Sequence, residues 1–316
     1  MYSNELLILL VLADMHFLSL REKVILKEKL DNIADVALLS KEDISQMIHR
    51  PLRTRTWNGE TAAAQAKQSA LLMERYNISY VVFGTESYPQ QLTNIYDPPF
   101  LLFLRGTGKL LAEGKYIAVV GTRNPTAEGM QAAVSFAAEA VHAGNIIVSG
   151  LAYGIDGAAH RGTIAANGKG IAVLACGVDT VYPSVHKRLA LQLLENGGLL
   201  ISEYAPGTPA QKWRFIQRNR IISGLSSAVV VVEAPPGSGA LSTAEFALEQ
   251  GRDVFFHAAA VSENAKRIGQ LAERRFLHST PKTVAQYVLE GAQIIHSYRD
   301  YCRFMTANTP DSQLLL

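Results

Sequence analysis

Six short apolar runs recur at a nearly constant interval through the second half of the chain, and this period constrains the fold more than any other feature. The intervals between their starts are 29, 25, 29, 29 and 25 residues, and the runs begin near Tyr116, Asn145, Gly170, Leu199, Ala228 and Asp253. Each interval has room for one strand, one turn and one helix of about ten residues, which is the period of a βαβ unit. The repeat therefore predicts an α/β fold, a parallel sheet with helices on both faces.

Glycine follows four of the predicted helices, where a left-handed C-terminal cap is expected. These glycines are Gly144, Gly168, Gly197 and Gly251. In a sheet of this kind, ligands bind outside the carboxyl ends of the strands. The functional site is therefore expected in the strand-to-helix loops.

Composition excludes several classes of protein. With 316 residues, 48% of them hydrophobic, the chain can bury a sizeable core and has the length of about two domains. Its net charge is only +2, so a nucleic-acid site must be a local patch. Cys176 and Cys302 lack the paired spacing of a zinc site, so neither a disulfide framework nor a structural metal is indicated. The apolar run 6–13 is too short for a membrane span, which needs about 20 residues, and we expect a soluble, cytoplasmic protein.

The pattern of apolar and charged residues along the sequence divides the chain into three predicted domains. Residues 4–75 have helical periodicity with ten basic and ten acidic residues, which predicts a small helical domain over residues 1–75. Residues 76–115 hold two strand-like runs and form either a connecting segment or the edge of the next domain, which spans residues 76–270. The period fades after Ala258, so residues 271–316 are expected to form a short helical appendage and a polar tail.

The first strand-to-helix loop, residues 121–126, is the strongest candidate for anion binding. Gly121 permits a tight turn, and the amides at the helix start can grip a phosphate together with the Arg123 guanidinium. The alternative is a turn with a surface arginine. Because Arg123 follows a strand directly, we favour anion binding and assign it to Gly121, Thr122, Arg123 and Asn124.

The second loop, residues 149–157, holds three glycines around one aromatic residue. Gly150 and Gly154 let the backbone approach a ligand closely, and Tyr153 can stack on a base. Asp156 is expected to cap the following helix. His160 is expected to be a packed or surface histidine, because no nucleophile or metal partner is evident beside it.

Two later segments are basic. The helix start after Tyr182-Pro183 carries His186, Lys187 and Arg188, for which ligand contact and a solvated helix face are both open. Residues 204–232 include no acidic residue but hold a dense mixture of cations and aromatic rings, namely Lys212, Trp213, Arg214, Phe215, Arg218 and Arg220. Such a mixture offers phosphate neutralisation and base stacking to a single strand. The alternative is an amphipathic helix with its aromatic residues in the core.

The fifth loop, residues 233–243, opens a helix and includes Gly237, Ser238 and Gly239, and its glycines and hydroxyl groups predict another anion cradle. Several enzyme motifs are missing. The sequence has no G-x-x-x-x-G-K-[ST] run, no G-x-G-x-x-G after the first strand of the repeat and no G-x-S-x-G elbow. The loops therefore indicate a binding surface, and no cofactor, metal or catalytic residue is expected.

Several ordered motifs resemble those of the DprA/Smf family of DNA-processing proteins, which act in bacterial natural transformation. They are Tyr88-Pro89, Asp97-Pro98-Pro99, V-G-T-R-N-P at 120–125, V-S-G-L-A-Y-G-I-D-G-A-A-H at 148–160, Tyr182-Pro183, R-N-R-I-I-S-G-L at 218–225 and L-E-Q-G-R at 248–252. The resemblance implies an extended Rossmann-like domain after a small SAM-like helical domain. It also implies single-stranded DNA binding, a homodimer, and loading of the RecA recombinase onto strands coated by single-strand-binding protein, without catalysis.

The same resemblance assigns residues to the DNA site. Arg123 would grip phosphate beside the glycine loops, and a basic residue after Tyr182-Pro183 would contribute. The mixture of cations and aromatic rings in residues 204–232 adds Arg218, Asn219 and Arg220 to the predicted DNA site. The chain departs from the family at Tyr153, where relatives often have arginine, and at Ser184, where they often have a basic residue. Lys187 or Arg188 would then supply that second charge. After the last motif the family pattern is not recognisable, which leaves the C-terminal module open.

Two other functions stay open. The run 236–239 with Thr243 and Glu245 faintly resembles the P-G-G-x-G-T-x-x-E loop of nucleoside-monophosphate phosphoribohydrolases. In such an enzyme Arg123 would hold the phosphate and Glu245 would assist glycosidic cleavage. The spacing differs, because the threonine of that motif directly follows the last glycine, whereas Thr243 does not directly follow Gly239. The other possibility is an interaction protein that has lost DNA binding through its departures from the family.

Overall fold

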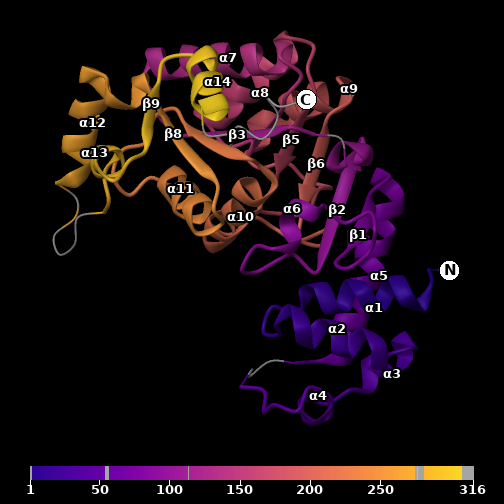
Figure 1. Ribbon diagram of the computed structural model, residues 1–316. Coiled ribbons are helices and arrows are strands. Elements are labelled where there is room, and N and C mark those ends of the chain that lie inside the picture. Colours follow the sequence, from indigo (N-terminus) through magenta and orange to yellow (C-terminus); the bar gives the residue numbers. More distant parts are fainter. Residues whose placement is uncertain (1, 54–56, 113, 275, 277–280, 308–316) are drawn as a thin grey trace, which may run out of the picture.

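The computed structural model describes residues 2–307 apart from 54–56, 113, 275 and 277–280. Its centre is a nine-stranded sheet in the order β1-β2-β6-β5-β4-β3-β7-β8-β9 (Figure 1). Neighbours from β6 to β9 in this order are parallel, whereas β2 is antiparallel to both β1 and β6. The strands are β1 (Ser79–Val82), β2 (Leu101–Gly106), β3 (Tyr116–Val120), β4 (Ile146–Ser149), β5 (Gly170–Val173), β6 (Leu199–Ser202), β7 (Ala228–Val231), β8 (Asp253–His257) and β9 (Gln293–Ile295).

The six predicted runs all form parallel strands of this sheet, each beginning within one residue of its expected start. Every residue of β3 to β7 is buried. These runs are almost continuously apolar because a parallel sheet is covered on both faces. The predicted α/β class is confirmed. The two predicted runs before the repeat also form strands, β1 and β2, and they extend the sheet beyond β6.

Helices cover both faces of the sheet (Figure 1). One face carries α7 (Ala127–His142), α8 (Ile155–Ala165), α9 (Lys187–Glu195) and α14 (Tyr298–Ala307). The other carries α6 (Gln90–Thr93), α10 (Lys212–Leu225), α11 (Gly239–Glu249) and α13 (Val284–Leu289). The connections include η1 (Gly108–Leu111), η2 (Ser184–His186), η3 (Ala258–Val261) and α12 (Glu263–Glu273).

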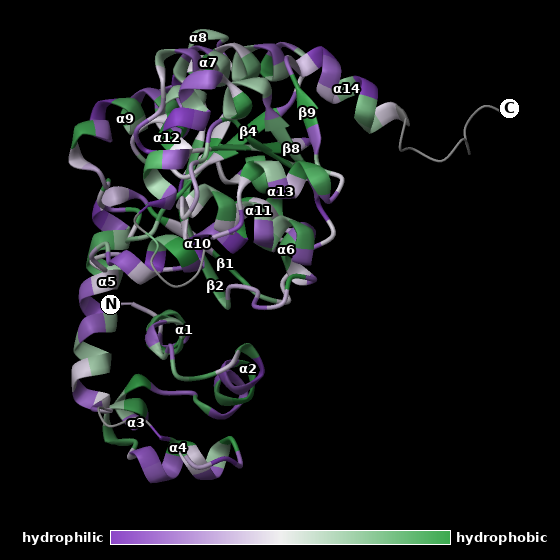
Figure 2. Ribbon diagram, turned by 90° about the vertical axis from the view of Figure 1, so that its left-hand side faces the viewer, coloured by the Kyte–Doolittle hydropathy of each residue, from purple (hydrophilic) through white to green (hydrophobic). Residues whose placement is uncertain are grey.

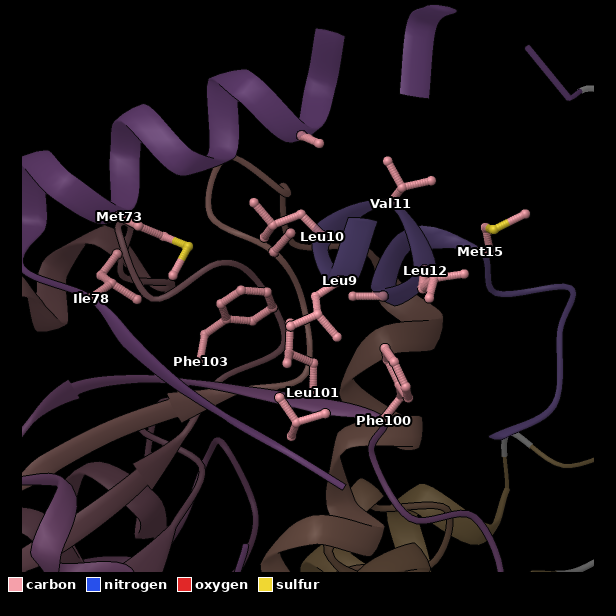
Figure 3. Close-up of a cluster of buried hydrophobic side chains, with 14 of the residues drawn as sticks. Leu9, Leu10, Val11, Leu12, Met15, Met73, Ile78, Phe100, Leu101 and Phe103 are labelled. Atoms are coloured by element: carbon pink, nitrogen blue, oxygen red, sulfur yellow. The ribbon is translucent and has the colours of Figure 1, made fainter. Parts of the chain in front are cut away.

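In the described residues, five helices precede the sheet and form a group on the side of β1 and β2 (Figure 2). They are α1 (Asn4–Asp14), α2 (Leu20–Lys29), α3 (Ile33–Leu38), α4 (Lys41–Met47) and α5 (Gly59–Tyr76). Of these helices, α1 and α5 lie nearest to β1 and β2, and α4 lies farthest from them (Figures 1 and 2). In α1 every residue from Leu7 to Ala13 is buried. Figure 3 shows Leu9 beside Phe103 and Leu101 of β2, so these helices share one apolar cluster with the sheet. None of the helices that the structure describes is long and apolar enough to cross a membrane.

Two predictions about the second half of the chain are wrong. After α8 the left-handed conformation belongs to Asn167, with φ 53°, and not to Gly168, whereas the other three predicted glycines have positive φ. The residues after 270 are not helical throughout, because β9 pairs with β8 at the edge of the sheet. A strand of three residues is too short to give a readable alternation. Residues 308–316 of the predicted tail lie outside the described residues.

Candidate nucleic-acid interface

Main-chain contacts tie together the loops that follow β3, β4 and β7. The Thr122 amide donates to the Glu233 carbonyl oxygen at 2.7 Å, and the Thr122 carbonyl accepts from the Ile155 amide at 3.2 Å. A Cβ on Gly121 would lie 2.5 Å from the Ile155 side chain. A Cβ on Gly154 would lie 2.2 Å from the Thr122 carbonyl oxygen. The predicted loops therefore meet at one rim of the sheet, and glycine is needed where they touch.

Arg123 projects from this rim over an aromatic pair. Its guanidinium carbon lies 5.0 Å from the centre of the Phe215 ring, and the Tyr182 ring centre lies 5.4 Å from the same ring. Arg123 and Asn124 are exposed, and Tyr182 is 49% exposed. A guanidinium stacked on a ring still presents its N–H edge to a phosphate. This part of the rim can therefore bind phosphate and stack on a base at adjacent positions.

A second exposed set lies on the loops after β4 and β5. Tyr153 is 46% exposed, and its ring centre is 5.5 Å from that of His186. The His186 ring is positioned by the Leu151 carbonyl oxygen, 2.9 Å from Nδ1. Lys187 and Arg188 follow on the first turn of α9 and are exposed. These residues offer a stacking surface with two long cationic side chains beside it.

Arg218 is not at the surface, which corrects its predicted contact with DNA. It is 3% exposed, and Nη1 donates to the carbonyl oxygens of Gly150, at 2.9 Å, and Val173. A Cβ on Gly150 would lie 2.5 Å from this guanidinium. Burial lowers the pKa of Arg218, and the negative charge of Asp156 opposes that effect. Arg218 therefore joins the carboxyl ends of β4 and β5 beneath the rim.

Asp156 is buried as well and does not cap α8 as predicted. Gly154 occupies the N-cap position, without a side-chain hydrogen bond. The Asp156 carboxylate instead accepts from the Ala152 amide at 3.4 Å. Burial raises the pKa of this carboxyl group, while the positive charge of Arg218 acts in the opposite direction. Asp156 and Arg218 are thus two buried groups under the exposed loops whose opposite charges attract one another.

The other two residues of the R-N-R motif are structural too, which corrects their predicted contact with DNA. Arg220 is buried, and its two terminal nitrogens each lie 2.7 Å from a carboxylate oxygen of Glu203. Its Nε donates to the Asp97 carbonyl oxygen at 2.8 Å. Asn219 is also buried, and its Nδ2 donates to the Gly239 carbonyl oxygen at 3.0 Å. The physical reason is the position of α10, in which every residue from 218 to 225 is buried.

The fifth loop lies open at the same edge. Ser238 caps α11, accepting from the Ala240 amide at 3.3 Å. Gly239 is exposed, and a Cβ there would meet nothing within 4 Å. Contact of Ser238 and Gly239 with DNA stays a prediction.

Two carboxylates at the ends of strands, Glu233, which is buried, and Glu203, which is partly buried, were not predicted. Glu233 follows β7 and accepts from the amide and the hydroxyl group of Thr126, each at 3.0 Å. Burial raises the pKa of Glu233. Glu203 follows β6 and pairs with Arg220. An acidic residue directly after a buried strand is the sequence signal that could have identified both, because that is where site residues gather in such sheets.

His160 is a packed core histidine. It is fully buried, and neither ring nitrogen has a hydrogen-bond partner among the residues that the structure describes. Burial lowers its pKa to about 3, and the nearby charges of His186 and Arg218 act in the same direction. The ring is therefore neutral and packs inside the fold.

The geometry does not favour the phosphoribohydrolase alternative. Glu245 lies on the exposed side of α11, where its carboxylate accepts from the Tyr287 hydroxyl at 3.3 Å. Arg123 instead stacks on Phe215 of α10. Within the described ranges no three His, Cys, Asp or Glu side chains form a group that could hold a metal ion.

A sequence model of the family described as DNA recombination-mediator protein A matches residues 79–305. The chain belongs to this family. The match includes every strand of the sheet and every loop of the rim, and it confirms the resemblance drawn from the motifs.

Individual relatives agree with this membership. The DNA processing protein DprA of Bacillus subtilis (strain 168) is 47% identical over 178 residues, which cover 56% of this chain and 60% of that protein. The chain thus spans about three-fifths of that relative's length. The solved structure of DprA from Streptococcus pneumoniae has a TM-score of 0.67 at 30% identity, covering 96% of this chain and 98% of that one. DNA processing protein A from Helicobacter pylori, whose structure was described with its single-stranded DNA binding mode, has a TM-score of 0.59 at 26% identity, covering 73% and 97%.

Proposed function

We propose that this chain binds single-stranded DNA along the rim and acts as a recombination mediator in natural transformation. The observation that carries the proposal is the Arg123 guanidinium stacked on Phe215 at the carboxyl ends of the parallel strands. Membership of a recombination-mediator family supports it, as does the single-stranded DNA binding of the Helicobacter pylori relative. In this role the chain protects incoming DNA in the cytoplasm and carries out no catalysis.

The rim supplies two kinds of contact to an unpaired strand. Arg123, Lys187 and Arg188 are exposed cations that neutralise phosphates. Tyr153 and Tyr182 are exposed rings, and each base stacked on such a ring contributes about 1–3 kcal/mol without a sequence preference. Ser238 and Gly239 add an uncrowded loop at the start of α11. This combination suits a binder that accepts any sequence.

The proposal is tested by titrating a labelled oligodeoxynucleotide at several salt concentrations and following fluorescence anisotropy. Each phosphate neutralised on a single strand contributes about −0.7 to the slope of log affinity against log salt. Arg123→Ala is expected to weaken binding for all sequences alike and to make that slope shallower by about 0.7. Arg299→Ala, which removes an exposed arginine from α14, is the matched control and should change neither quantity.

Two results would count against the proposal. Unchanged affinity of Arg123→Ala at moderate salt removes that residue from the site. If the unmodified chain shows no binding at all, the alternative of an interaction protein without DNA binding is favoured.

The remaining partners are RecA, single-strand-binding protein and a second copy of the chain, and the family resemblance supports each of them. The test is RecA filament formation on strands coated by single-strand-binding protein. Addition of the chain is expected to accelerate it, and Arg123→Ala to remove the acceleration. Sedimentation measures the homodimer in the same samples.

An assay for adenine released from AMP is expected to show none, and release would restore the enzyme alternative.

A further inference from the structure

Arg214, in the first turn of α10, is a buried cation outside the rim. Its side chain is 7% exposed, and its guanidinium carbon lies 4.9 Å from the Tyr204 ring centre and 5.1 Å from the Trp213 ring centre. One nitrogen, Nη1, donates to the Pro209 carbonyl oxygen. The buried Nε has no hydrogen-bond partner among the described residues.

The other buried arginines of α10 differ from Arg214 in one respect. Arg220 has the carboxylate of Glu203, and Arg218 has the charge of Asp156 beside it. In the described part of the chain no carboxylate is paired with Arg214. Burying a charge without a counter-charge is costly, and π-faces and one carbonyl offset only part of that cost. An anion bound from the solvent would supply the missing counter-charge for Arg214.

A cavity lies at the position where such an anion could bind. It has a volume of about 310 Å³ and separates α1 and α5 from the loop after β6, and its lining includes Arg214, Gln65, Gln68, Thr208 and Asp14. That volume is at the lower end of the roughly 300–1,000 Å³ found for small-molecule sites. With Ser69, the polar part of the lining thus combines one cation, two amide side chains, two hydroxyl groups and one carboxylate, and the rest of the lining is apolar except for Gly207.

The helix that carries Arg214 adds positive potential. α10 has 14 residues, and the side chain of its N-cap residue Gln211 accepts no hydrogen bond from the backbone amides of the first turn. Its Oε1 accepts instead from Trp213 Nε1, at 2.7 Å. Uncapped amides at a helix start attract anions. Lys212 is exposed on the same turn.

We propose that this cavity is a second anion site, separate from the rim, that binds the phosphate of a nucleotide through Arg214. Trp213 does not line the cavity, but it is 46% exposed next to the guanidinium and can stack on a base that extends out of the cavity. Asp14 disfavours a bare phosphate ion but accepts hydrogen bonds from the amino group of a base. The ligand is therefore a whole nucleotide, either free or as part of a strand.

The test measures binding of AMP, inorganic phosphate and an oligodeoxynucleotide by calorimetry to the full chain and its variants. Arg214→Gln is expected to weaken nucleotide binding roughly tenfold to a hundredfold, because a hydrogen bond to a charged group is lost. Arg123→Ala should leave AMP affinity unchanged, which separates this site from the rim. Arg299→Gln is the charge-matched control and should also leave it unchanged.

A second variant covers the case in which Arg214→Gln fails to fold. Asp14 is 54% exposed at the end of α1, so Asp14→Asn is expected to fold and to bind inorganic phosphate more tightly than the unmodified chain. Binding of AMP that depends on Arg214 identifies a free nucleotide as ligand. Binding of the oligodeoxynucleotide alone, still dependent on Arg214, identifies a strand. The proposal is wrong if Arg214→Gln changes the affinity for neither AMP nor the oligodeoxynucleotide and Asp14→Asn does not change the affinity for inorganic phosphate. In that case Arg214 only packs against its two rings.

Discussion

Gly154 places the loop after β4 against the loop after β3 with a backbone conformation that side-chain-bearing residues avoid. Its φ is 74° with ψ −125°, and a Cβ would lie 2.2 Å from the Thr122 carbonyl oxygen. Gly154→Ala is expected to destabilise the chain by about 3 kcal/mol, the upper end of the cost of such backbone strain, because a clash is added. It should also weaken binding of single-stranded DNA, because Arg123 follows Thr122 directly. Urea denaturation and the anisotropy titration measure the two effects.

Gly144 is the matched control for this variant. Its φ is 82°, but a Cβ there would meet nothing within 4 Å. Gly144→Ala should therefore cost only about 1 kcal/mol of conformational strain and leave DNA binding unchanged. Equal losses of stability in the two variants would mean that the contact with Thr122 is not tight.

His160 predicts a specific dependence of stability on pH. Burial lowers its pKa from 6.5 to about 3, so between these values the unfolded chain binds a proton that the folded chain does not. The stabilising contribution of the neutral ring is therefore complete above pH 6.5 and is lost as pH falls toward 3. The loss is about 1.4 kcal/mol per pH unit, or about 2 kcal/mol at pH 5. Urea denaturation at pH 7 and pH 5 measures it.

His160→Leu isolates this contribution, because leucine fills a similar space and does not titrate. The variant is expected to show a smaller difference in unfolding free energy between the two pH values, by about 2 kcal/mol. An identical difference in the variant and the unmodified chain would show that other groups account for the acid sensitivity.

At the scale of elements, α10 is joined to the sheet by arginines that point inward. Arg218→Met would leave the carbonyl oxygens of Gly150 and Val173 without their donor and the Asp156 charge uncompensated. We expect a loss of about 3–5 kcal/mol in unfolding free energy, which is typical when one partner of a buried charge pair is removed. Lys187→Met, at an exposed position of α9, should change stability by no more than about 0.5 kcal/mol.

A double variant distinguishes charge from packing. Adding Asp156→Asn to Arg218→Met removes the uncompensated charge, so the combined loss should be smaller than the sum of the two single losses by about 1–3 kcal/mol. Strict additivity would mean that the two groups do not interact in the folded chain.

For the whole molecule, the N-terminal helices and the sheet unfold together if their shared apolar cluster is essential. Leu9 of α1 is 1% exposed and packs in the same cluster as Phe103 of β2 (Figure 3). Leu9→Ala is expected to cost about 2–5 kcal/mol. Because the cluster is continuous, the helices and the sheet should lose the same amount.

The two tryptophans of the chain measure this coupling, since Trp57 precedes α5 and Trp213 lies on α10. Trp57→Phe and Trp213→Phe leave one fluorescent reporter in each part. Both reporters should give the same unfolding midpoint, with Leu9→Ala lowering both equally. Separate midpoints would indicate that residues 1–75 are an independent domain, as their sequence predicts.

The sequence alone determined where the parallel strands of the repeat begin. The interval between apolar runs located β3 to β8 within one residue, because burial on both faces imposes a continuous apolar run wherever a parallel strand lies. The sequence also predicted the roles of Arg123 and of the glycines in the first two loops. Close approach of two backbones requires glycine, and a charged residue directly after a strand indicates a binding site. The motifs added the family.

Only the tertiary structure decided which of the basic residues face solvent. From the sequence, both Arg123 and Arg218 were predicted to contact DNA. In the structure Arg123 projects over Phe215, whereas Arg218 is buried under Gly150. Their positions depend on how α10 lies against the sheet, and that orientation is set by contacts between segments far apart in the chain. The same holds for β9, whose three residues become a strand only because β8 offers an edge to pair with. Short-range patterns specify elements, whereas the environment of a side chain is a property of the packed molecule.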